Sequence, residues 1–443
     1  MCLKIPVGEH CLNKKGDRMA KMKDSGIEWI GEIPEGWKSI FCKYIFNVIS
    51  GSTPESSKKE YWDGEINWIT PADYKTDDKY VCKGKRNITL AGYNSCSTNL
   101  IPKNSIIFSK RAPIGTVCIN STELCTNQGC LACVSHNKNV NIDYYYYLFS
   151  IGTEHYNLLG SGTTFKEISA TAFENSKLLL PPLAEQHKIA DFLDAKCSKI
   201  DALKKDITAQ IEILEQYKKS VITEAVTKGI ARGTKMKETN SKWITVAPEH
   251  WKMEKLKYNL TVHEVKGYGD KEVLSLYREL GIVPKNSRDD NHNVTSEDTS
   301  KYKYVRKGDF VINKMKAWQG SVAVSDYEGI VSPAYYVYEF VNKAYEKRYF
   351  HHLMRNKILA DEFRRISGGI REGQWDLDRN QFENMYLPLP PLAEQQQIAD
   401  FLDAKCSSID SIITAKKQQL AKLEDYKKSL IYEYVTGKKQ VSL

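Results

Sequence analysis

Apolar residues recur at seven-residue intervals through two long stretches of the chain. In the first stretch this stripe comprises Leu193, Ile200, Ile207, Leu214 and Val221, flanked by Cys197, Leu203, Ile211, Tyr217 and Ala225. In the second it comprises Leu402, Ile409, Leu423 and Leu430, interrupted by Lys416 and flanked by Cys406, Ile412, Ile413, Leu420, Tyr426 and Tyr434. A sustained heptad repeat is typical of a coiled-coil seam. The alternative is the buried face of an ordinary helix. The length and the duplication favour two helices of about 40 residues, roughly 60 Å each, that pair within the chain.

Residues at both ends of these stretches are typical of helix boundaries. Pro181 and Pro182 preset the backbone at the start of the first helix, and Glu185 adds negative charge to its first turn. Gly229 follows the last periodic residue, and Gly437 does the same in the second stretch.

The remaining sequence has a different pattern. Short β-branched and aromatic runs at 106–108, 117–119, 310–312 and 322–324 are bounded by Gly, Pro, Asn and Ser, which predicts strands separated by turns. Helices are predicted at 142–159 and 344–366. Each of these blocks is therefore expected to be an α+β domain with a strand-rich core.

The chain contains an internal duplication. Residues 180–201 and 389–410 are identical at 19 of 22 positions, with a shift of 209. We therefore predict two copies of one unit of about 210 residues, each a variable block followed by a nearly invariant tail. The predicted segments are a first globular domain at 1–180, a long helix and linker at 181–236, a second globular domain at 237–389 and a second long helix at 390–443.

Composition narrows the class of protein. The 443 residues are 41% apolar and 27% charged, which is typical of globular domains. The first residues are too polar for a signal peptide, and the 11 cysteines are an odd number, so we expect reduced thiols and a cytoplasmic protein. The net charge of +9 permits nucleic-acid binding.

Catalytic motifs are not found in the sequence. It has no GxxxxGK[ST] phosphate loop, and its two Pro-Pro pairs lack the flanking residues that amino-methyltransferases use. The cysteines near 118–133 fall in strand-like sequence without paired CxxC spacing, and His351 and His352 lie in a predicted helix, so no metal site is expected. Asp73, Tyr74 and Lys75 match only a fragment of a nuclease motif. We predict a non-catalytic chain.

Nucleic-acid contacts are predicted at the ends of two equivalent strands and in three polar loops, because cations can neutralise phosphates and polar side chains can read base edges. The strand-end residues are Lys110 and Arg111 in the first block and Lys314, Lys316, Trp318 and Gln319 in the second. The loop residues are Thr163, Thr164 and Lys166, then Arg371 and Gln374, then Ser52, Thr53 and Lys58. The alternative is that these segments are ordinary solvated or connecting turns.

The chain resembles the specificity subunit of type I restriction-modification enzymes. The resemblance is carried by the element LPPLAEQ…IADFLD at 180–194 and again at 389–403, and it covers the chain from about residue 25. It implies two target recognition domains, each reading one half of a split DNA site, and two long helices that form an antiparallel coiled coil. The role of residues 1–24 is not fixed by it.

The same resemblance implies partners. The helices are expected to dock two modification subunits that use S-adenosylmethionine to methylate adenine, and two restriction subunits that use ATP and Mg²⁺ are further candidates. Polar residues near the helix starts are the predicted partner-binding set: Glu185, Gln186, Asp191, Glu394, Gln395 and Asp400. The alternative function is a coiled-coil scaffold without DNA specificity. No membrane partner is expected.

Overall fold

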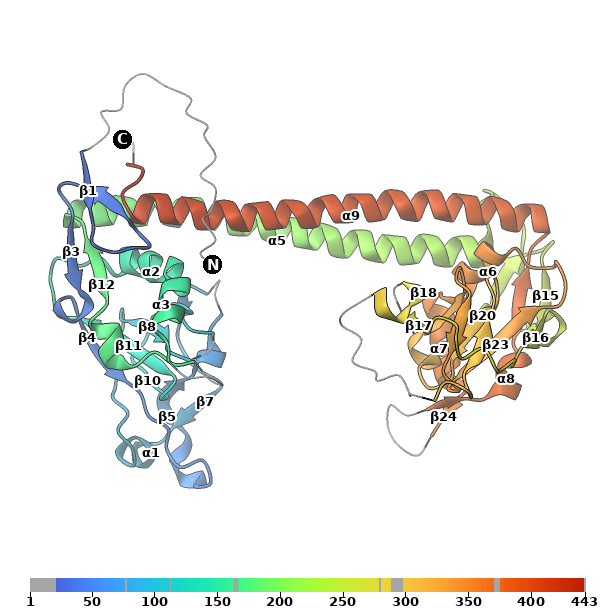
Figure 1. Ribbon diagram of the computed structural model, residues 1–443, viewed down its shortest axis with the longest axis horizontal. Coiled ribbons are helices and arrows are strands. Elements are labelled where there is room, and N and C mark those ends of the chain that lie inside the picture. Colours follow the sequence, from blue (N-terminus) through green and yellow to red (C-terminus); the bar gives the residue numbers. More distant parts are fainter. Residues whose placement is uncertain are drawn as a thin grey trace, which may run out of the picture. The chain divides into compact units, whose positions relative to one another are not determined.

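The computed structural model describes residues 21–75, 78–111, 113–161, 166–278, 280–287, 298–369 and 375–441 (Figure 1). The contacts of the chain divide it into two compact units. Unit 1 comprises Met1–Lys205 with Leu420–Leu443, and unit 2 comprises Asp206–Gln419. Each unit therefore holds one globular domain and a part of both long helices, which cuts across the four segments expected from the sequence.

Both long helices are present where the heptad pattern predicts them. Helix α5 spans Leu183–Lys228 and helix α9 spans Leu392–Val435. Each begins directly after a Pro-Pro pair. Gly229 and Gly437 adopt left-handed φ angles of 77° and 74°, a conformation that ends helices and that glycine adopts without strain.

The two helices run antiparallel within each unit, because later residues of α5 contact earlier residues of α9. The ion pairs across them join Asp201 to Lys427 at 2.7 Å and Lys204 to Glu424 at 2.5 Å in unit 1, and Lys218 to Asp410 at 2.6 Å in unit 2. Lys416, which interrupts the stripe, donates from Nζ to Oε1 of Gln210 at 2.5 Å. The predicted antiparallel coiled coil is confirmed.

Residues flanking the stripe divide into a buried and an exposed set. The buried seam includes Leu193, Cys197, Ile200, Ile207 and Ile211 of α5 and Leu402, Cys406, Ile409, Ile413 and Leu430 of α9. Leu203, Tyr217, Ile412 and Tyr426 are instead 44–56% exposed. They lie at the edge of the seam, where Lys405 Nζ of α9 is 5.5 Å from the ring centroid of Tyr217 on α5. These four residues are referred to below as the outer strip.

The globular domain of unit 1 is built on a five-stranded sheet. Its strand order is β4 (Phe46–Ser50), β11 (Cys130–Ser135), β8 (Ile106–Ser109), β9 (Val117–Asn120) and β6 (Tyr80–Val81). A smaller sheet contains β10 (Cys125–Thr126), β5 (Trp62–Ile69) and β7 (Arg86–Ile88), and β12 (Lys177–Leu180) pairs with β3 (Lys38–Phe41). Strands β1 (Met22–Asp24) and β2 (Glu32–Pro34) form a hairpin. The helices are α1 (Leu90–Asn94), α2 (Ile142–Ile151), α3 (Thr153–Leu159) and α4 (Ala170–Glu174).

Unit 2 repeats this plan with a smaller central sheet. The strand order is β16 (Leu260–Val262), β23 (Tyr335–Phe340), β20 (Phe310–Asn313) and β21 (Val322–Val324). The paired strands are β13 (Met236–Glu238) with β14 (Val246–Pro248), β15 (Lys252–Lys255) with β26 (Tyr386–Leu389), β17 (Leu274–Tyr277) with β18 (Gly281–Pro284), β19 (Lys303–Val305) with β22 (Gly329–Val331), and β24 (Ser367–Gly368) with β25 (Asp376–Leu377). The helices are α6 (Lys347–Met354), α7 (Lys357–Arg365) and α8 (Arg379–Glu383).

The predicted strands are confirmed, but both predicted domain helices are broken. The expected helix at 142–159 divides at Gly152 into α2 and α3. The expected helix at 344–366 begins only at Lys347 and divides into α6 and α7. Asn356 causes the second break, since its side chain accepts a hydrogen bond from the backbone N–H of Ile358 and so caps a new helix.

A buried glutamine attaches each long helix to its own domain. In unit 1, Gln186 is 0% exposed. Its side-chain oxygen accepts from the N–H of Asn141 at 2.9 Å, and its amide donates to the carbonyls of Asn139 and Pro181 at 3.1 and 2.9 Å. The start of α5 is thereby fixed to the start of α2.

Gln395 makes the equivalent bonds in unit 2. It is also 0% exposed, accepts from the N–H of Glu346 and donates to the carbonyls of Ala344 and Pro390, all at 2.8 Å. The prediction that Gln186 and Gln395 bind partner subunits is therefore wrong. Each is occupied by buried backbone groups that would otherwise lack a partner.

Each domain also contacts the C-terminal end of the long helix that belongs to the other repeat. The hydroxyl of Tyr144 in α2 donates to the carbonyl of Val435 near the end of α9 at 2.8 Å. The hydroxyl of Tyr349 in α6 donates to the carbonyl of Val226 near the end of α5 at 3.2 Å. Each domain is thus packed against helical segments from both copies of the repeat.

We predict that Gln395→Ala destabilises unit 2 by about 2–4 kcal/mol, because three buried backbone groups lose their partner. The midpoint of denaturant unfolding measures this change. Gln396→Ala, at the exposed neighbouring position, is the matched control and should shift the midpoint little. Equal shifts for the two variants would contradict the role of Gln395.

Candidate nucleic-acid interface

Two of the predicted contact segments of unit 1 meet at the end of strand β8. The backbone N–H of Lys110 donates to the carbonyl of Gly129, and the carbonyl of Lys110 accepts from the N–H of Ile168 at 3.0 Å. Glu167 lies between the cations, with its oxygens 3.0 Å from Lys110 Nζ and 2.8 Å from Arg111 Nε. The strand end and the segment that follows the glycine-rich stretch are therefore adjacent.

Unit 2 has the same junction at the end of strand β20. The N–H of Lys314 donates to the carbonyl of Ala334, and the carbonyl of Lys314 accepts from the N–H of Leu377. Lys314 Nζ lies 3.1 Å from an oxygen of Asp376. Glu167 and Asp376 are separated by the 209-residue shift of the duplication, and Lys110 and Lys314 follow equivalent strands, so the ion pair occurs in both copies.

The ion pairs determine which of the predicted cations are available to contact a phosphate. Burial raises the pKa of Glu167, but the hydrogen bonds and charges of Lys110 and Arg111 outweigh it and hold the pKa below its ordinary value. The carboxylate is therefore ionised at neutral pH, and Lys110, whose side chain is 13% exposed, is held inside the junction. Arg111, Lys166 and Lys316 remain exposed.

The third predicted segment lies beside the junction of unit 1. The N–H of Ser52 donates to the carbonyl of Thr126 at 2.9 Å, and Thr53 hydrogen-bonds Gln128. Gly51 permits this approach, since a Cβ there would lie 2.1 Å from the Thr126 carbonyl oxygen. Gln128, an exposed residue with no distinguishing motif, was not singled out from the sequence.

Lys58, unlike Lys110 and Lys314, pairs with a carboxylate that is close to it in sequence. It pairs with Glu55 at 3.3 Å, and its Nζ lies 5.2 Å from the ring centroid of Tyr61. All three residues are close in sequence and exposed or half-buried at the surface. Lys58 is therefore part of a local surface turn.

The strand-end turn of unit 2 contains an aromatic pair. Trp318 lies in a short 3₁₀ helix at Ala317–Gln319, and its Nε1 donates to the carbonyl of Met315 at 3.1 Å. Its ring centroid lies 5.2 Å from that of Trp375. Gln319 is half-buried in the same turn.

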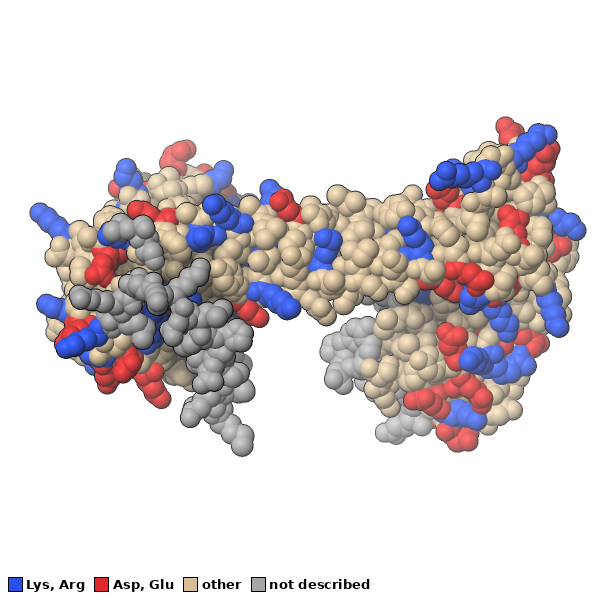
Figure 2. All heavy atoms as spheres, turned by 90° about the horizontal axis from the view of Figure 1, so that it is seen from above, with Lys and Arg blue, Asp and Glu red and all other residues tan. Residues whose placement is uncertain are grey.

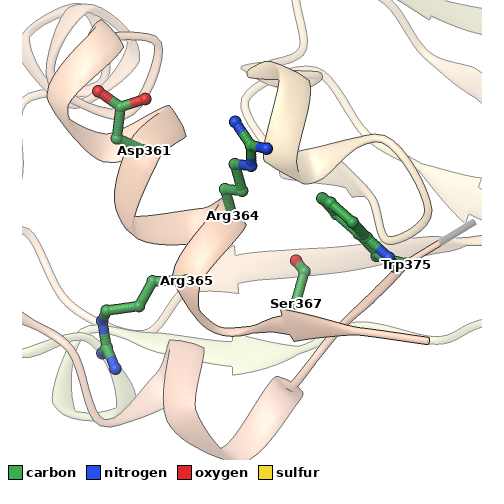
Figure 3. Close-up of a pocket in the computed structure, with 5 residues that line it drawn as sticks. All are labelled: Asp361, Arg364, Arg365, Ser367 and Trp375. Carbon is green, nitrogen blue, oxygen red and sulfur yellow. The ribbon is translucent and has the colours of Figure 1, made fainter. Parts of the chain in front are cut away.

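A hollow lies beside this aromatic pair (Figure 3). It is lined by Asp361, Arg364, Arg365, Ser367 and Trp375. Arg364 and Asp361 belong to a helix that the sequence predicted only as part of the domain frame, so no pattern marked them. Among the other predicted contacts, Thr163, Thr164, Arg371 and Gln374 lie outside the described residues.

Three of the four remaining partner-binding candidates have contacts within their own units. Glu185 accepts from Trp37 Nε1 at 2.8 Å, Glu394 bonds His250 Nε2 at 2.7 Å, and Asp400 pairs with Arg348 at 2.8 Å. Asp191 is exposed on α5. These contacts attach the helix starts to the domains, as the buried glutamines do.

Within the described ranges, no cluster of three or more His, Cys, Asp or Glu side chains is placed to hold a metal ion. Burial raises the pKa of Cys130 to about 12 and that of Cys125 to about 11, so both thiols stay protonated at neutral pH. None of the described helices combines the length and apolar character needed to cross a bilayer.

Known proteins are similar to this chain in sequence and architecture. The sequence model of a family described as the type I restriction modification DNA specificity domain matches residues 34–213 and 248–424. Over 190 residues the chain is 38% identical to the type I restriction enzyme MjaIX specificity subunit of Methanocaldococcus jannaschii, an alignment covering 42% of this chain and 43% of that protein. Over 413 residues it is 22% identical to the EcoBI specificity subunit of Escherichia coli, covering 88% of this chain and 83% of that protein.

The fold is also similar to that of a solved structure. A chain from a structure describing complex assembly and conformational transition of the type I restriction-modification system aligns with a TM-score of 0.68 at 14% identity, covering 92% of this chain and 99% of that one. The alignment with the MjaIX relative spans less than half of that protein. The two segments matched by the family's sequence model cover most of the chain, one in each copy of the repeat, and the chain therefore belongs to the type I restriction-modification DNA specificity family.

Proposed function

We propose that this chain is the specificity subunit of a type I restriction-modification complex and that each unit reads one half of a bipartite DNA site. The duplicated junction carries this proposal. Lys110 with Glu167 and Lys314 with Asp376 hold equivalent loops at equivalent strand ends. Two similar surfaces, one in each unit, would suit the two half-sites of one duplex if they bind it with pseudo-twofold symmetry.

The two half-sites would differ in sequence. Around its junction, unit 1 has the segment with Ser52 and Thr53 and the small sheet containing β5 and β7. Unit 2 has Trp318 and Trp375 at its own junction. Because bases are distinguished by the side chains that reach their edges, different side chains around one frame give an asymmetric site. The long helices would then set the length of the unread spacer.

The outer strip supplies a surface for partner subunits. Leu203 and Tyr426 belong to unit 1, whereas Tyr217 and Ile412 belong to unit 2, and the 209-residue shift relates the two pairs. Seen from above, Lys and Arg stand out singly along the helices, separated by stretches without charge (Figure 2). Half-exposed apolar side chains on a helix suit a helical partner. One pair in each unit accommodates one modification subunit in each unit.

Partner subunits would then supply the chemistry. Modification subunits would bind S-adenosylmethionine and methylate adenine, and restriction subunits would bind ATP and Mg²⁺. This chain would direct those activities without catalysing them, in the cytoplasm where the DNA lies. Phosphate contacts made by such partners would also explain a net charge of only +9 on a DNA-reading chain.

An exchange experiment tests whether each unit reads its half-site independently of the other. Residues 241–388 are replaced by the matching block of another specificity subunit, and the methylated sequence is read by methylome sequencing of cells carrying the complex. We expect one half of the site to change and the other to persist. A change in both halves would rule out independent reading.

The two lysines of the unit 2 turn should differ in their contribution to DNA binding. Lys316 is exposed without an ion pair in the described structure, whereas Lys314 is already paired with Asp376. We expect Lys316→Ala to reduce the slope of log K against log salt by about 1, and Lys314→Ala to reduce it less. Binding titrations of the full complex over a salt series measure both, and the opposite ranking would contradict the junction as described.

Substitution in the outer strip should remove a partner and leave the fold intact. Tyr217→Asp places a charge on an exposed site, so we expect unchanged thermal unfolding but binding of one modification subunit where the wild type binds two. Light scattering of the reconstituted complex gives the count. Lys219→Asp, about 200° further round α5, is the matched control. Full assembly of the Tyr217→Asp variant would eliminate the strip as the docking surface.

A further inference from the structure

Four arginines in the described part of unit 2 form ion pairs with carboxylates. The ion-paired ones are Arg306 with Asp309 and Glu339, Arg348 with Asp400 and Asp403, Arg365 with Glu362, and Arg379 with Glu383. Arg364 differs from these four. It is exposed, and its guanidinium lies 5.6 Å from the ring centroid of Trp375.

The ring of Trp375, which contacts Arg364, is held in place by a second tryptophan. Trp375 packs on Trp318 with centroids 5.2 Å apart, and Trp318 is anchored through its indole N–H to the carbonyl of Met315. Stacking restrains a guanidinium in position while leaving its N–H donors free for a ligand. Arg365, by contrast, points away from this side of the helix (Figure 3).

Unit 1 contains the same arrangement. The guanidinium of Arg86 lies 3.7 Å from the ring centroid of Trp62, whose ring packs edge-on against Trp68 at 5.1 Å. The Nε1 atom of Trp68 donates to the carbonyl of Ser52, which places this group beside the predicted contact segment. Arg86 is exposed and forms no ion pair in the described structure. Thus each unit presents an exposed arginine in cation–π contact with one ring of a tryptophan pair, more closely in unit 1 than in unit 2.

Asp361 indicates which part of DNA the arginine of unit 2 would contact. It lies three residues before Arg364 on α7, lines the same hollow and is exposed. A carboxylate beside the arginine disfavours a phosphate, since like charges repel. It does suit a G·C pair, because arginine donates to O6 and N7 of guanine and aspartate accepts from N4 of cytosine.

We propose that Arg364 and Asp361 read a G·C base pair in the half-site of unit 2, and that Arg86 reads a guanine in the half-site of unit 1. This inference rests on the proposed DNA-reading function and assigns specificity-determining residues to it. Trp375 and Trp62 contact the arginines, and Trp318 and Trp68 pack on those rings, so the tryptophan pairs act as positioning residues.

The experiment compares variants of the full complex in selection from a randomised duplex library. For Arg364→Ala we expect the preference for guanine to fall about 10- to 100-fold at one position of the unit 2 half-site, with the unit 1 half-site unchanged. Arg86→Ala should give the mirror result. Arg364→Lys retains the charge but not the bidentate geometry, so it should not restore the preference. Asp361→Ala should weaken selection at the same base pair as Arg364→Ala.

Controls separate this inference from the function on which it rests. Arg365→Ala removes the same charge at the adjacent residue and should leave every position unchanged. A uniform loss of affinity in Arg364→Ala that Arg364→Lys rescues would identify a phosphate contact and overturn the inference, as would an unchanged base preference. A wild-type complex with no preference in either half-site would refute the proposed function itself. In each variant, retained selection at the other positions of the same half-site shows that the mutated unit is folded.

Discussion

The hydroxyls of Tyr144 and Tyr349 each donate to a carbonyl near the end of the long helix from the other repeat, and this exchange of helix ends determines how the molecule is built. This exchange requires antiparallel helices, and the ion pairs between α5 and α9 show that the helices are antiparallel. The buried glutamines fix the near ends in the same way. Each domain is therefore attached at two places, to the start of its own long helix and to the end of the long helix from the other repeat.

Much of this frame was predictable from the sequence, because heptads and an internal repeat are periodic and need no knowledge of distant contacts. The glutamines show why the rest was not. Gln186 is polar and lies at a helix start, which favours an exposed position, yet it is buried because backbone groups of another segment need its amide. The partner of Lys110 is Glu167, more than fifty positions away, and no local pattern predicts that pair.

The same limit applies to the recognition surface. The sequence places Arg364 in a predicted helix but does not mark it as a contact residue, because a single arginine in a helix forms no recognisable pattern. Arg364 is distinguished by its contact with Trp375, which in turn packs on Trp318, and both tryptophans come from other segments of the chain. The positive charges near each junction thus fall into two groups. Some hold loops to strands by pairing with carboxylates, and others remain available to a ligand, a distinction that net charge conceals.

The exchange of helix ends also has a consequence for the order in which the chain acquires its structure. Unit 2 is continuous in sequence from Asp206 to Gln419, so all of its contacts exist once that stretch has been synthesised. Unit 1 needs Leu420 and the residues beyond it to cover the apolar face of its domain, although its globular part leaves the ribosome first. During translation that face stays uncovered while more than 200 residues are added, which makes unit 1 the kinetically vulnerable half of the protein.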